Sequence, residues 1–386
     1  MGVRSRRARR ALEVGRVARR AKLRHVLGEV GAIGEREPNR EHARKFREGL
    51  EELGTTFIKL GQLLSSRPDL LPEVYIEELG GLVDAVAPFP AEDARQIVDE
   101  EIGLAEFARF DDEPVASASI AQIHGALLRS GRAVVVKVRR PGIQEQVAVD
   151  LGLLRSLTSF AENRSETARL LQLQALADEL EAHLSSELDF REEAHGAEVI
   201  AGVMSEHEHL VVPEVIRPYV TQRVVVQERI DGVRVDLEHG LSEETARQLA
   251  RELFRAYVQQ ITVHGIYHAD PHRGNILLMP DGRLALLDFG LLGRLDDDTR
   301  RTLGLLLVAL AQNRADDVAD LILDLSWRTL SSDAAGFVHD LRRKLPRYHW
   351  RPLTGIRTGE ALADLQRLAL KHGIALPTGF ALVGKT

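Results

Sequence analysis

The chain has 386 residues, more than one ordinary domain of roughly 100–150 residues, so its length predicts two lobes or two domains. With 44% hydrophobic and 28% charged residues it can bury a core, and its lack of cysteine excludes disulfides, cysteine-ligated zinc and thiol chemistry. The net charge of −7 conceals an asymmetry, because residues 1–25 hold ten basic residues and one acidic residue.

Residues 1–30 are predicted to form a basic N-terminal arm. Val14, Val17, Ala18 and Ala21 recur at helical spacing and indicate a weak amphipathic helix. Two interpretations are open: an arm that binds an anionic membrane surface, at up to about 1 kcal/mol per basic residue, or an arm that is solvated or disordered. Nucleic acid is not an expected partner, because no aromatic residue lies among the arginines to stack on bases.

Residues 31–110 are predicted to form a helical extension, with a linker at 31–39 and helices to about residue 108. On a helix, Phe57, Leu60 and Leu64 form one apolar stripe, while Lys59 and Gln62 project together from the opposite side. Taken alone, this pattern also fits an amphipathic helix with a solvated lysine and glutamine.

From residue 114 the pattern changes to strands. The strand-like segments 114–128 and 133–139 are separated by residues 129–132, whose Ser-Gly pair predicts a hairpin turn. Two or three helices follow to about residue 205. Further strand candidates lie in an otherwise helical remainder, at 210–212, at 223–230 and as a short pair within 276–287.

The first of these segments contains a loop like those that cover nucleotide phosphates, with alanine in the places of glycine. Ala116, Ala118 and Ala121 hold these places, and Ser119 lies among them; all four are candidate nucleotide contacts. Alanine resists positive φ angles and close backbone approach, so we expect a stiffer loop than glycine would give.

Lys137 is the lone lysine in the following valine-rich strand. The chain has seven lysines against forty-four arginines. A lysine on a strand at this place is typical of a kinase-like site, where it meets the α- and β-phosphates of ATP. A lysine that snorkels from a buried strand is the structural alternative.

A second group of polar residues has the spacing of a phosphoryl-transfer loop. Asp270 and Asn275 fit the pattern H-x-D-x-x-x-x-N, in which the aspartate orients or deprotonates a hydroxyl and the asparagine binds metal. Asp288 begins an Asp-Phe-Gly triplet, where it would hold Mg²⁺ against the β- and γ-phosphates. Four elements follow one another in the order found in kinases: the alanine loop, Lys137, Asp270 with Asn275, and Asp288. This order favours a nucleotide site over four unrelated turns and strands.

His264, His268 and His272 recur every four residues, as on a metal-binding helix. Pro271 would interrupt that helix, and the loop pattern already accounts for His268, so zinc is not expected.

These residues resemble the UbiB/AarF-type atypical kinases, protein-kinase-like proteins associated with isoprenoid-quinone biosynthesis. The resemblance covers roughly residues 45–386. Its most specific marks are the K-x-G-Q motif at Lys59, Gly61 and Gln62 and the E-x-D motif at Glu187 and Asp189. The alanine-rich stretch 118–124 is similar to the nucleotide loop of the family.

The resemblance implies a role for each motif. In the family, the K-x-G-Q helix lies across the nucleotide site, blocks the entry of a protein substrate and contacts the E-x-D residues. Lys59 and Gln62 are therefore implied members of the catalytic set. The implied metal ligands are Asn275, Asp288, Glu187 and Asp189.

Two further glutamates have implied roles. Glu193 matches the glutamate that pairs with the strand lysine, with Glu192 as its rival, and Glu228 falls where the linker between the lobes contacts adenine, largely through its backbone. Glu187 and Asp189 would be about 200° apart on a regular helix, so both can face one ligand only if the helix ends or bends near Leu188.

The sequence departs from the family in two places. Arg273 stands where the family usually has proline, and the chain ends at Thr386, where relatives often continue into apolar membrane-spanning segments. We expect that such a tail was removed. No A-P-E triplet follows Asp288, which argues against protein substrates in trans.

We therefore expect an α+β, protein-kinase-like two-lobed fold with a small β-rich N-lobe, a helical C-lobe and a helical N-terminal extension. The expected segments are the arm 1–30, the extension 31–110, the N-lobe 111–232 with a helical insert at about 141–186, and the C-lobe 233–386.

The expected function is a Mg-ATP-dependent atypical kinase or ATPase at a membrane surface, supporting isoprenoid-quinone synthesis or lipid handling. ATP and Mg²⁺ are its expected cofactors, and an anionic lipid surface and quinone-biosynthesis proteins its expected partners. The expected location is cytoplasmic, peripheral to or anchored in the inner face of the membrane. A small-molecule phosphotransferase of the aminoglycoside/choline kinase type and a nucleotide-binding pseudokinase scaffold are the alternatives.

Overall fold

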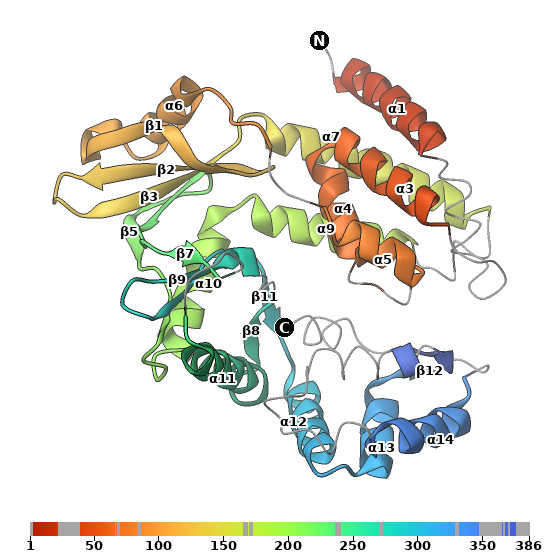
Figure 1. Cartoon of the computed structure of the whole chain (residues 1–386). Helices are drawn as coiled ribbons and strands as arrows, with labels where there is room; N and C mark the ends of the chain where they lie inside the picture. The colour runs from red at the N-terminus through yellow and green to blue at the C-terminus, as the bar shows by residue number, and fades with distance from the viewer. Residues whose placement is uncertain are drawn as a thin grey trace. The chain divides into compact units, whose positions relative to one another are not determined.

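The computed structural model of the chain is mixed α+β, as predicted (Figure 1). It describes residues 3–21, 39–65, 67, 70–82, 86–164, 169, 173–235, 241–269, 273–328, 332–346, 365, 367–369 and 371–375. The chain divides into two compact units: unit 1 comprises residues 1–192 and 215–229, and unit 2 comprises residues 193–214 and 230–386. The predicted arm, extension and most of the predicted N-lobe therefore belong to one unit.

Unit 1 contains a group of helices around a core of buried leucines and aromatic residues. Asn39 caps α3 by accepting a hydrogen bond from the backbone N–H of Glu41, and Gly54, with φ of 85°, ends that helix. The helices of this group are α1 (Val3–Arg20), α3 (Arg40–Leu53), α4 (Thr55–Ser65), α5 (Glu73–Leu79), α7 (Ile143–Glu162) and α9 (Leu173–Glu187).

The basic arm is a helix that packs against α3 and α7 within unit 1, and not a free arm. Val14, Val17 and Ala21, three of the four residues of the predicted apolar stripe, are buried. A Cβ atom on Gly49 of α3 would lie only 3.0 Å from the Ala21 Cβ, so this glycine allows the close crossing of α1. The prediction of a helix is confirmed, but its stripe is covered by α3, which leaves only the outer arginines for a membrane surface.

Unit 1 also contains a five-stranded antiparallel sheet in the order β1-β2-β3-β6-β5 (Figure 1). The valines of its central strands pack against α6 (Ala91–Glu101), which a short 3₁₀ turn (Leu104–Glu106) follows. The strands are β1 (Phe107–Ser117), β2 (Ala121–Leu128), β3 (Ala133–Arg139), β5 (Val215–Val220) and β6 (Val224–Glu228).

Two boundaries in this region differ from the prediction, and one strand was not predicted. The segment 114–128 is two strands and not one, because the chain reverses at Ser119 and Ile120. The helices end at Glu101, seven residues earlier than expected. Strand β5 was not predicted, because Pro218 weakens its strand signal; at the edge of the sheet this proline is tolerated.

Unit 2 contains two small sheets and most of the remaining helices. One sheet has the order β4-β10-β9-β7 and includes the predicted antiparallel pair β9 and β10; another pairs β8 with β11. The strands are β4 (Leu210–Val211), β7 (Val233–Arg234), β8 (Ile266–His268), β9 (Ile276–Leu278), β10 (Leu284–Leu286) and β11 (Leu292–Arg294).

The helices of unit 2 enclose a second core, which includes Leu306, Ile322 and Phe337. Asp296 and Ser242 cap α12 and α11 by accepting bonds from the N–H groups of Thr299 and Thr245. The helices are α11 (Glu243–Gln259), the π turn Gln260–His264, the 3₁₀ turn Arg273–Asn275, α12 (Asp297–Ala311), α13 (Ala315–Leu325) and α14 (Ala334–Lys344), followed by the strand pair β12 (Trp327–Arg328) with β13 (Ile374–Ala375). α10 (Phe190–Val203) begins at the end of unit 1 and continues into unit 2. Within the described ranges, no helix is long and apolar enough to cross a membrane.

Candidate functional site

Strand β3 separates its apolar core face from a polar face that carries Lys137. Val134, Val136 and Val138 are fully buried in the core under α6. The alternation of strand side chains places Lys137 and Arg139 on the opposite face. Lys137 is half-buried there, and its Nζ lies 5.4 Å from the centre of the Phe190 ring. The face of an aromatic ring attracts a cation, so this contact stabilises the charged form of Lys137.

Glu228 lies at the end of β6, and its side chain is on the face opposite to Lys137. It pairs in register with Val134, and directly paired residues share a face of the sheet. Its carboxylate lies 3.7 Å from Arg132. A contact of Glu228 with adenine would therefore go through the backbone, as the resemblance implies.

The alanine loop is a tight reversal between β1 and β2. The N–H of Ala118 donates to the carbonyl of Ala121 at 2.8 Å, so Ser119 and Ile120 form the tip. No residue of this loop has a positive φ angle. Alanine therefore costs the loop nothing in backbone strain, and Ala116, Ala118 and Ala121 fit it as well as glycine would.

The K-x-G-Q helix, α4, is fastened to α9 by an ion pair. Lys59 Nζ lies 2.8 Å from Glu187 Oε1, and the two side chains are only 12% and 17% exposed. Gly61 is closely packed, because a Cβ atom there would lie 2.3 Å from a methyl group of Leu82, whose side chain would have to shift. Gln62 lies one turn beyond Lys59 and is half-buried. The contact that the resemblance implies between K-x-G-Q and E-x-D is thus present.

Glu187 is held in its ionised form by two neighbours. His183, one turn earlier on α9, places its Nε2 2.8 Å from the same carboxylate oxygen. Burial by itself raises the pKa of Glu187, but the charge of Lys59 and the hydrogen bond from His183 outweigh it and lower the pKa to about 2. A metal ion at Glu187 would have to replace these two partners.

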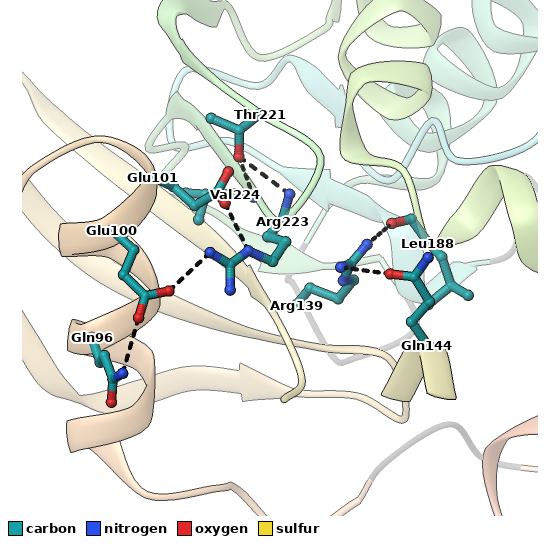
Figure 2. Close-up of polar contacts among 9 residues, drawn as sticks. All are labelled: Gln96, Glu100, Glu101, Arg139, Gln144, Leu188, Thr221, Arg223 and Val224. Carbon is teal, nitrogen blue, oxygen red and sulfur yellow. Dashed lines mark hydrogen bonds and ion pairs between the residues drawn. The ribbon is translucent and has the colours of Figure 1, made fainter. Parts of the chain in front are cut away.

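The helix breaks inside the E-x-D motif, as the sequence predicts. α9 ends at Glu187 and α10 begins at Phe190, so Leu188 and Asp189 lie between two helices. Arg139 of β3 donates from Nη1 to the buried carbonyl of Leu188 at 2.6 Å (Figure 2). Arg191 donates to Asp189 at 2.6 Å, and this hydrogen bond holds the pKa of Asp189 below its ordinary value.

Arg139 belongs to a larger polar network on unit 1 (Figure 2). Its Nη2 donates to Gln144 at 3.1 Å. Arg223, in the turn before β6, bonds Glu101 at 2.7 Å and Glu100 at 2.9 Å. Burial lowers the pKa of Arg139, and the positive charge of Arg223 lowers it further. These contacts hold the end of β3, from which Arg139 reaches the carbonyl of Leu188, and the neighbouring start of β6.

In unit 2, Asp288 has an unusual backbone conformation. Its φ angle is 57°, and Asn313 is the only other non-glycine residue with a positive φ in the part of the chain that the structure describes. Such a conformation costs of order 1 kcal/mol or more and is typical of functional sites. The N–H of Gly290 donates to Asp288 Oδ1 at 3.3 Å.

Asn275 lies beside the Asp288 segment. The N–H of Leu287 donates to the carbonyl of Asn275 at 2.8 Å, and Ile276 pairs with Leu286 in the sheet. The two predicted ligands of one metal ion are therefore brought together within unit 2. An amide and a carboxylate are oxygen ligands of the kind Mg²⁺ prefers, so this pair fits the implied cation.

Glu193 lies on α10 and is buried, with 5% of its surface exposed. One turn later, Gly196 packs against the Asp-Phe-Gly segment, since a Cβ atom there would lie 2.5 Å from the carbonyl oxygen of Phe289. The phenyl ring of Phe289 in turn lies 5.2 Å from the ring of His268. α10 thus joins Glu193 to the segment that carries Asp288.

The remaining predicted residue, Asp270, lies outside the described residues. Among those that the structure does describe, no group of three or more His, Asp or Glu side chains could hold a metal ion. Two contributors were missed at the sequence level. His183 is four residues before Glu187, a visible helical spacing, whereas Arg139 is two residues after Lys137 and so on the same strand face.

Comparison with known proteins agrees with these motifs. The model of the ABC1 atypical kinase-like domain matches residues 81–322. The uncharacterised protein slr0889 of Synechocystis is 35% identical over 378 residues, covering 92% of this chain and 90% of its own length. A protein of Xylella fastidiosa named "Probable protein kinase UbiB" is 33% identical over 360 residues, and the chain spans 64% of its length.

A solved structure is also similar. It is described as the complex of Rv3197 with erythromycin from Mycobacterium tuberculosis, with a TM-score of 0.56 and 25% identity. The similarity covers 87% of this chain and 90% of that one. The fold is therefore protein-kinase-like, as predicted.

Proposed function

Because the chain belongs to the ABC1 atypical kinase-like family, we propose that it is a Mg-ATP-dependent atypical kinase or ATPase. The observation that carries the proposal is the place of Asn275 beside the segment that carries Asp288 in unit 2. Asp288 keeps a strained left-handed conformation beside Asn275, and strain of this kind is retained where a site requires it.

Each described residue has a distinct task in this proposal. Mg²⁺ bound to ATP would neutralise the charge that develops on the phosphates. Asn275 and Asp288 would hold the cation and Lys137 would orient the α- and β-phosphates, with Glu193 as the glutamate assigned to that lysine by the resemblance. Positioning and charge neutralisation supply most of phosphoryl-transfer catalysis, so few groups suffice. Asp270 would activate the acceptor, water or a hydroxyl.

Protein substrates in trans are not part of the proposal. Only residues 291–296 separate Gly290 from α12, and Leu292–Arg294 of this segment pair with β8. A conventional kinase has a longer activation segment and an A-P-E anchor there. The short paired segment supports a small acceptor or water.

We further propose that the reaction occurs at a membrane surface and supports the biosynthesis of an isoprenoid quinone or the handling of lipids. The UbiB names of similar proteins support the link to quinones. Arg7, Arg9, Arg16 and Arg19 are exposed on α1, whose apolar stripe is covered, so attraction to anionic lipid would be electrostatic. It would weaken with salt.

The test is ATP hydrolysis by the full chain with and without anionic vesicles and quinone-like phenols. Asp288→Asn removes the carboxylate charge at the cation, and Asp281→Asn is the matched control, because Asp281 is an exposed turn residue paired with Arg283. Membrane-stimulated hydrolysis lost only in Asp288→Asn supports the proposal. Nucleotide binding without turnover in the unmodified chain would instead indicate a scaffold, and phosphorylation of a supplied small alcohol would indicate a small-molecule phosphotransferase.

A further inference from the structure

Two polar side chains lie in the apolar layer between the five-stranded sheet and α6. Gln122 and His124 are both 0% exposed, and they occupy alternate positions of β2 directly after the alanine loop. They pair in register with Val138 and Val136 of β3, whose side chains are fully buried in the same layer. Buried polar groups are costly unless they are hydrogen-bonded, so their partners indicate what they do.

The amide of Gln122 binds the backbone of Phe89, just before α6. The N–H of Phe89 can only donate, so the atom that meets it at 2.9 Å is the side-chain oxygen of Gln122. The amide nitrogen of Gln122 donates to the carbonyl of Phe89 at 3.3 Å and to Nε2 of His124 at 2.9 Å. One side chain therefore holds both backbone groups of Phe89, and its orientation is fixed.

The position of the proton on His124 follows from the same bonds. The carbonyl of Asp111 can only accept, and it lies 2.8 Å from Nδ1, so Nδ1 carries the proton. Nε2 then accepts from Gln122, which agrees with the orientation that Phe89 imposes on the amide. His124 is thus neutral. A proton on Nε2 would set two donors against each other and break the bond to Gln122.

The surroundings of the ring favour this neutral form. Burial lowers the pKa of His124 from its ordinary value of 6.5, and the charge of Arg95 on α6 acts in the same direction. The hydrogen bond to Asp111 and the carboxylates of Asp111 and Asp112 oppose burial but do not outweigh it. Asp112 lies 2.6 Å from Arg95 and Asp111 lies 2.8 Å from Arg109, so each carboxylate has its own cation, and β3 faces the ring with a valine.

The segment 86–89 is also tied to the alanine loop itself. Arg140 donates from Nη2 to the carbonyls of Ala87 and Ala118, each at 3.1 Å. Gln122 adds the bonds at the β2 end of the loop. The loop is therefore held along residues 86–89 at two places, and one of them depends on His124.

We propose that Gln122 and His124 are positioning residues of the nucleotide site, which hold the alanine loop against residues 86–89 only while His124 is neutral. The proposal rests on the nucleotide role proposed above for the loop. Without the bond to His124, the amide of Gln122 is free to turn away from Phe89 and the loop is held less firmly. Mg-ATP should then bind more weakly, whereas turnover of bound Mg-ATP should change little.

The pH dependence has a definite sign. Because the folded pKa of His124 is lowered, the restraint is complete above pH 6.5 and is lost as the pH falls through the folded pKa. Nuclear magnetic resonance of the full chain with ¹⁵N-labelled histidine reports the protonation of each ring nitrogen without nucleotide. We expect His124 to carry its proton on Nδ1 at pH 7 and to gain a second proton only below pH 6.5. A proton on Nε2 at pH 7 would overturn the proposal.

Two variants test the positioning role. Gln122→Glu keeps the shape of the side chain and the acceptor for Phe89, but it replaces the donor to His124 with a carboxylate oxygen, so His124 should become doubly protonated at pH 7. His124→Asn keeps a donor for Asp111 and removes the acceptor for Gln122. Gln248→Glu is the matched control, because Gln248 is exposed on α11.

Hydrogen exchange without nucleotide should become about tenfold faster in residues 86–89 and in the loop for both variants, since each loses one buried bond. Calorimetry should show a dissociation constant for Mg-ATP raised about tenfold, with kcat changed less than about twofold, and no such change in Gln248→Glu. Unchanged exchange in Gln122→Glu, or a fall in kcat at unchanged affinity, would overturn the proposal. An unmodified chain that bound no Mg-ATP would count against the proposed function, and the exchange rates and histidine spectra would still decide whether the pair holds the loop.

Discussion

Replacing Lys59 with methionine should destabilise unit 1 and raise the pKa of Glu187. The substitution keeps the aliphatic stem of Lys59 but removes the charge that lies 2.8 Å from Glu187. Glu187 then retains His183 as its described partner. Burial raises the pKa of Glu187, and without the charge of Lys59 only His183 opposes this effect, so the pKa rises.

The size of the effect follows from the pKa. The pKa of Glu187 falls from the ordinary value of 4.5 to about 2. A shift of this size corresponds to about 3 kcal/mol of folding free energy. Because His183 remains, we expect Lys59→Met to lower the free energy of unfolding by about 2–3 kcal/mol at neutral pH.

The pH dependence has a definite sign. The folded pKa lies below the unfolded one, so the contribution of Glu187 is complete above pH 4.5 and is lost as the pH falls toward 2. The difference in stability between the unmodified chain and Lys59→Met should therefore be largest above about pH 5 and shrink on acidification.

The assay is urea unfolding followed by circular dichroism between pH 3 and pH 8, with hydrogen exchange of α4 and α9 peptides to locate the change. Arg155→Met is the matched control, because Arg155 also bonds α9, at Asp178, but is 48% exposed. That variant should cost less than about 1 kcal/mol. Equal losses in the two variants, or a pH-independent loss in Lys59→Met, would refute the reasoning.

Three further predictions concern packing, the N-terminal helix and the strained aspartate. Gly61→Ala should cost about 1–3 kcal/mol in thermal unfolding by overpacking α4, whereas Gly15→Ala, with open space around it, should cost nothing. Arg10→Met leaves the carboxylate of Asp150 buried at 0% exposure without its 2.7 Å partner, so trypsin should cleave α1 faster, and adding Asp150→Leu should restore resistance. Asp288→Gly should abolish Mg-dependent ATP turnover, because the carboxylate proposed to hold the cation is lost. The unfolding temperature should not fall, because glycine adopts a φ of 57° without strain, and a large drop in that temperature would contradict this.

Local patterns carried most of the fold and the placement of the motifs. The valine run around Lys137 predicted a buried strand with one lysine in it, and the 200° separation of Glu187 and Asp189 predicted the break at Leu188. Both follow from backbone geometry, which short stretches of sequence determine.

Contacts between distant segments could not be read in the same way. The stripe of α1 has the same sequence signature whether it meets lipid, water or α3, and the apolar residues and Gly49 of α3 that cover it are revealed only by the fold. Likewise the positive φ of Asp288 has no mark in the sequence, and the bond from neighbouring Leu287 to Asn275, thirteen residues before Asp288, is revealed only by the fold. Tertiary partners, and not local preference, determine these features.

The crossing of α1 over α3 has a practical consequence for recombinant work. A shortened version that starts after Ala21 would expose the apolar surface of α3 around Phe46 and Gly49. The carboxylate of Asp150 would also lose its partner Arg10. Exposed apolar surface of this kind promotes self-association. Membrane binding by such a version, or its absence, would then reflect the exposed apolar surface of the helices as much as the missing arginines. Replacing the exposed arginines of α1 with uncharged residues is therefore the cleaner way to separate membrane attachment from folding.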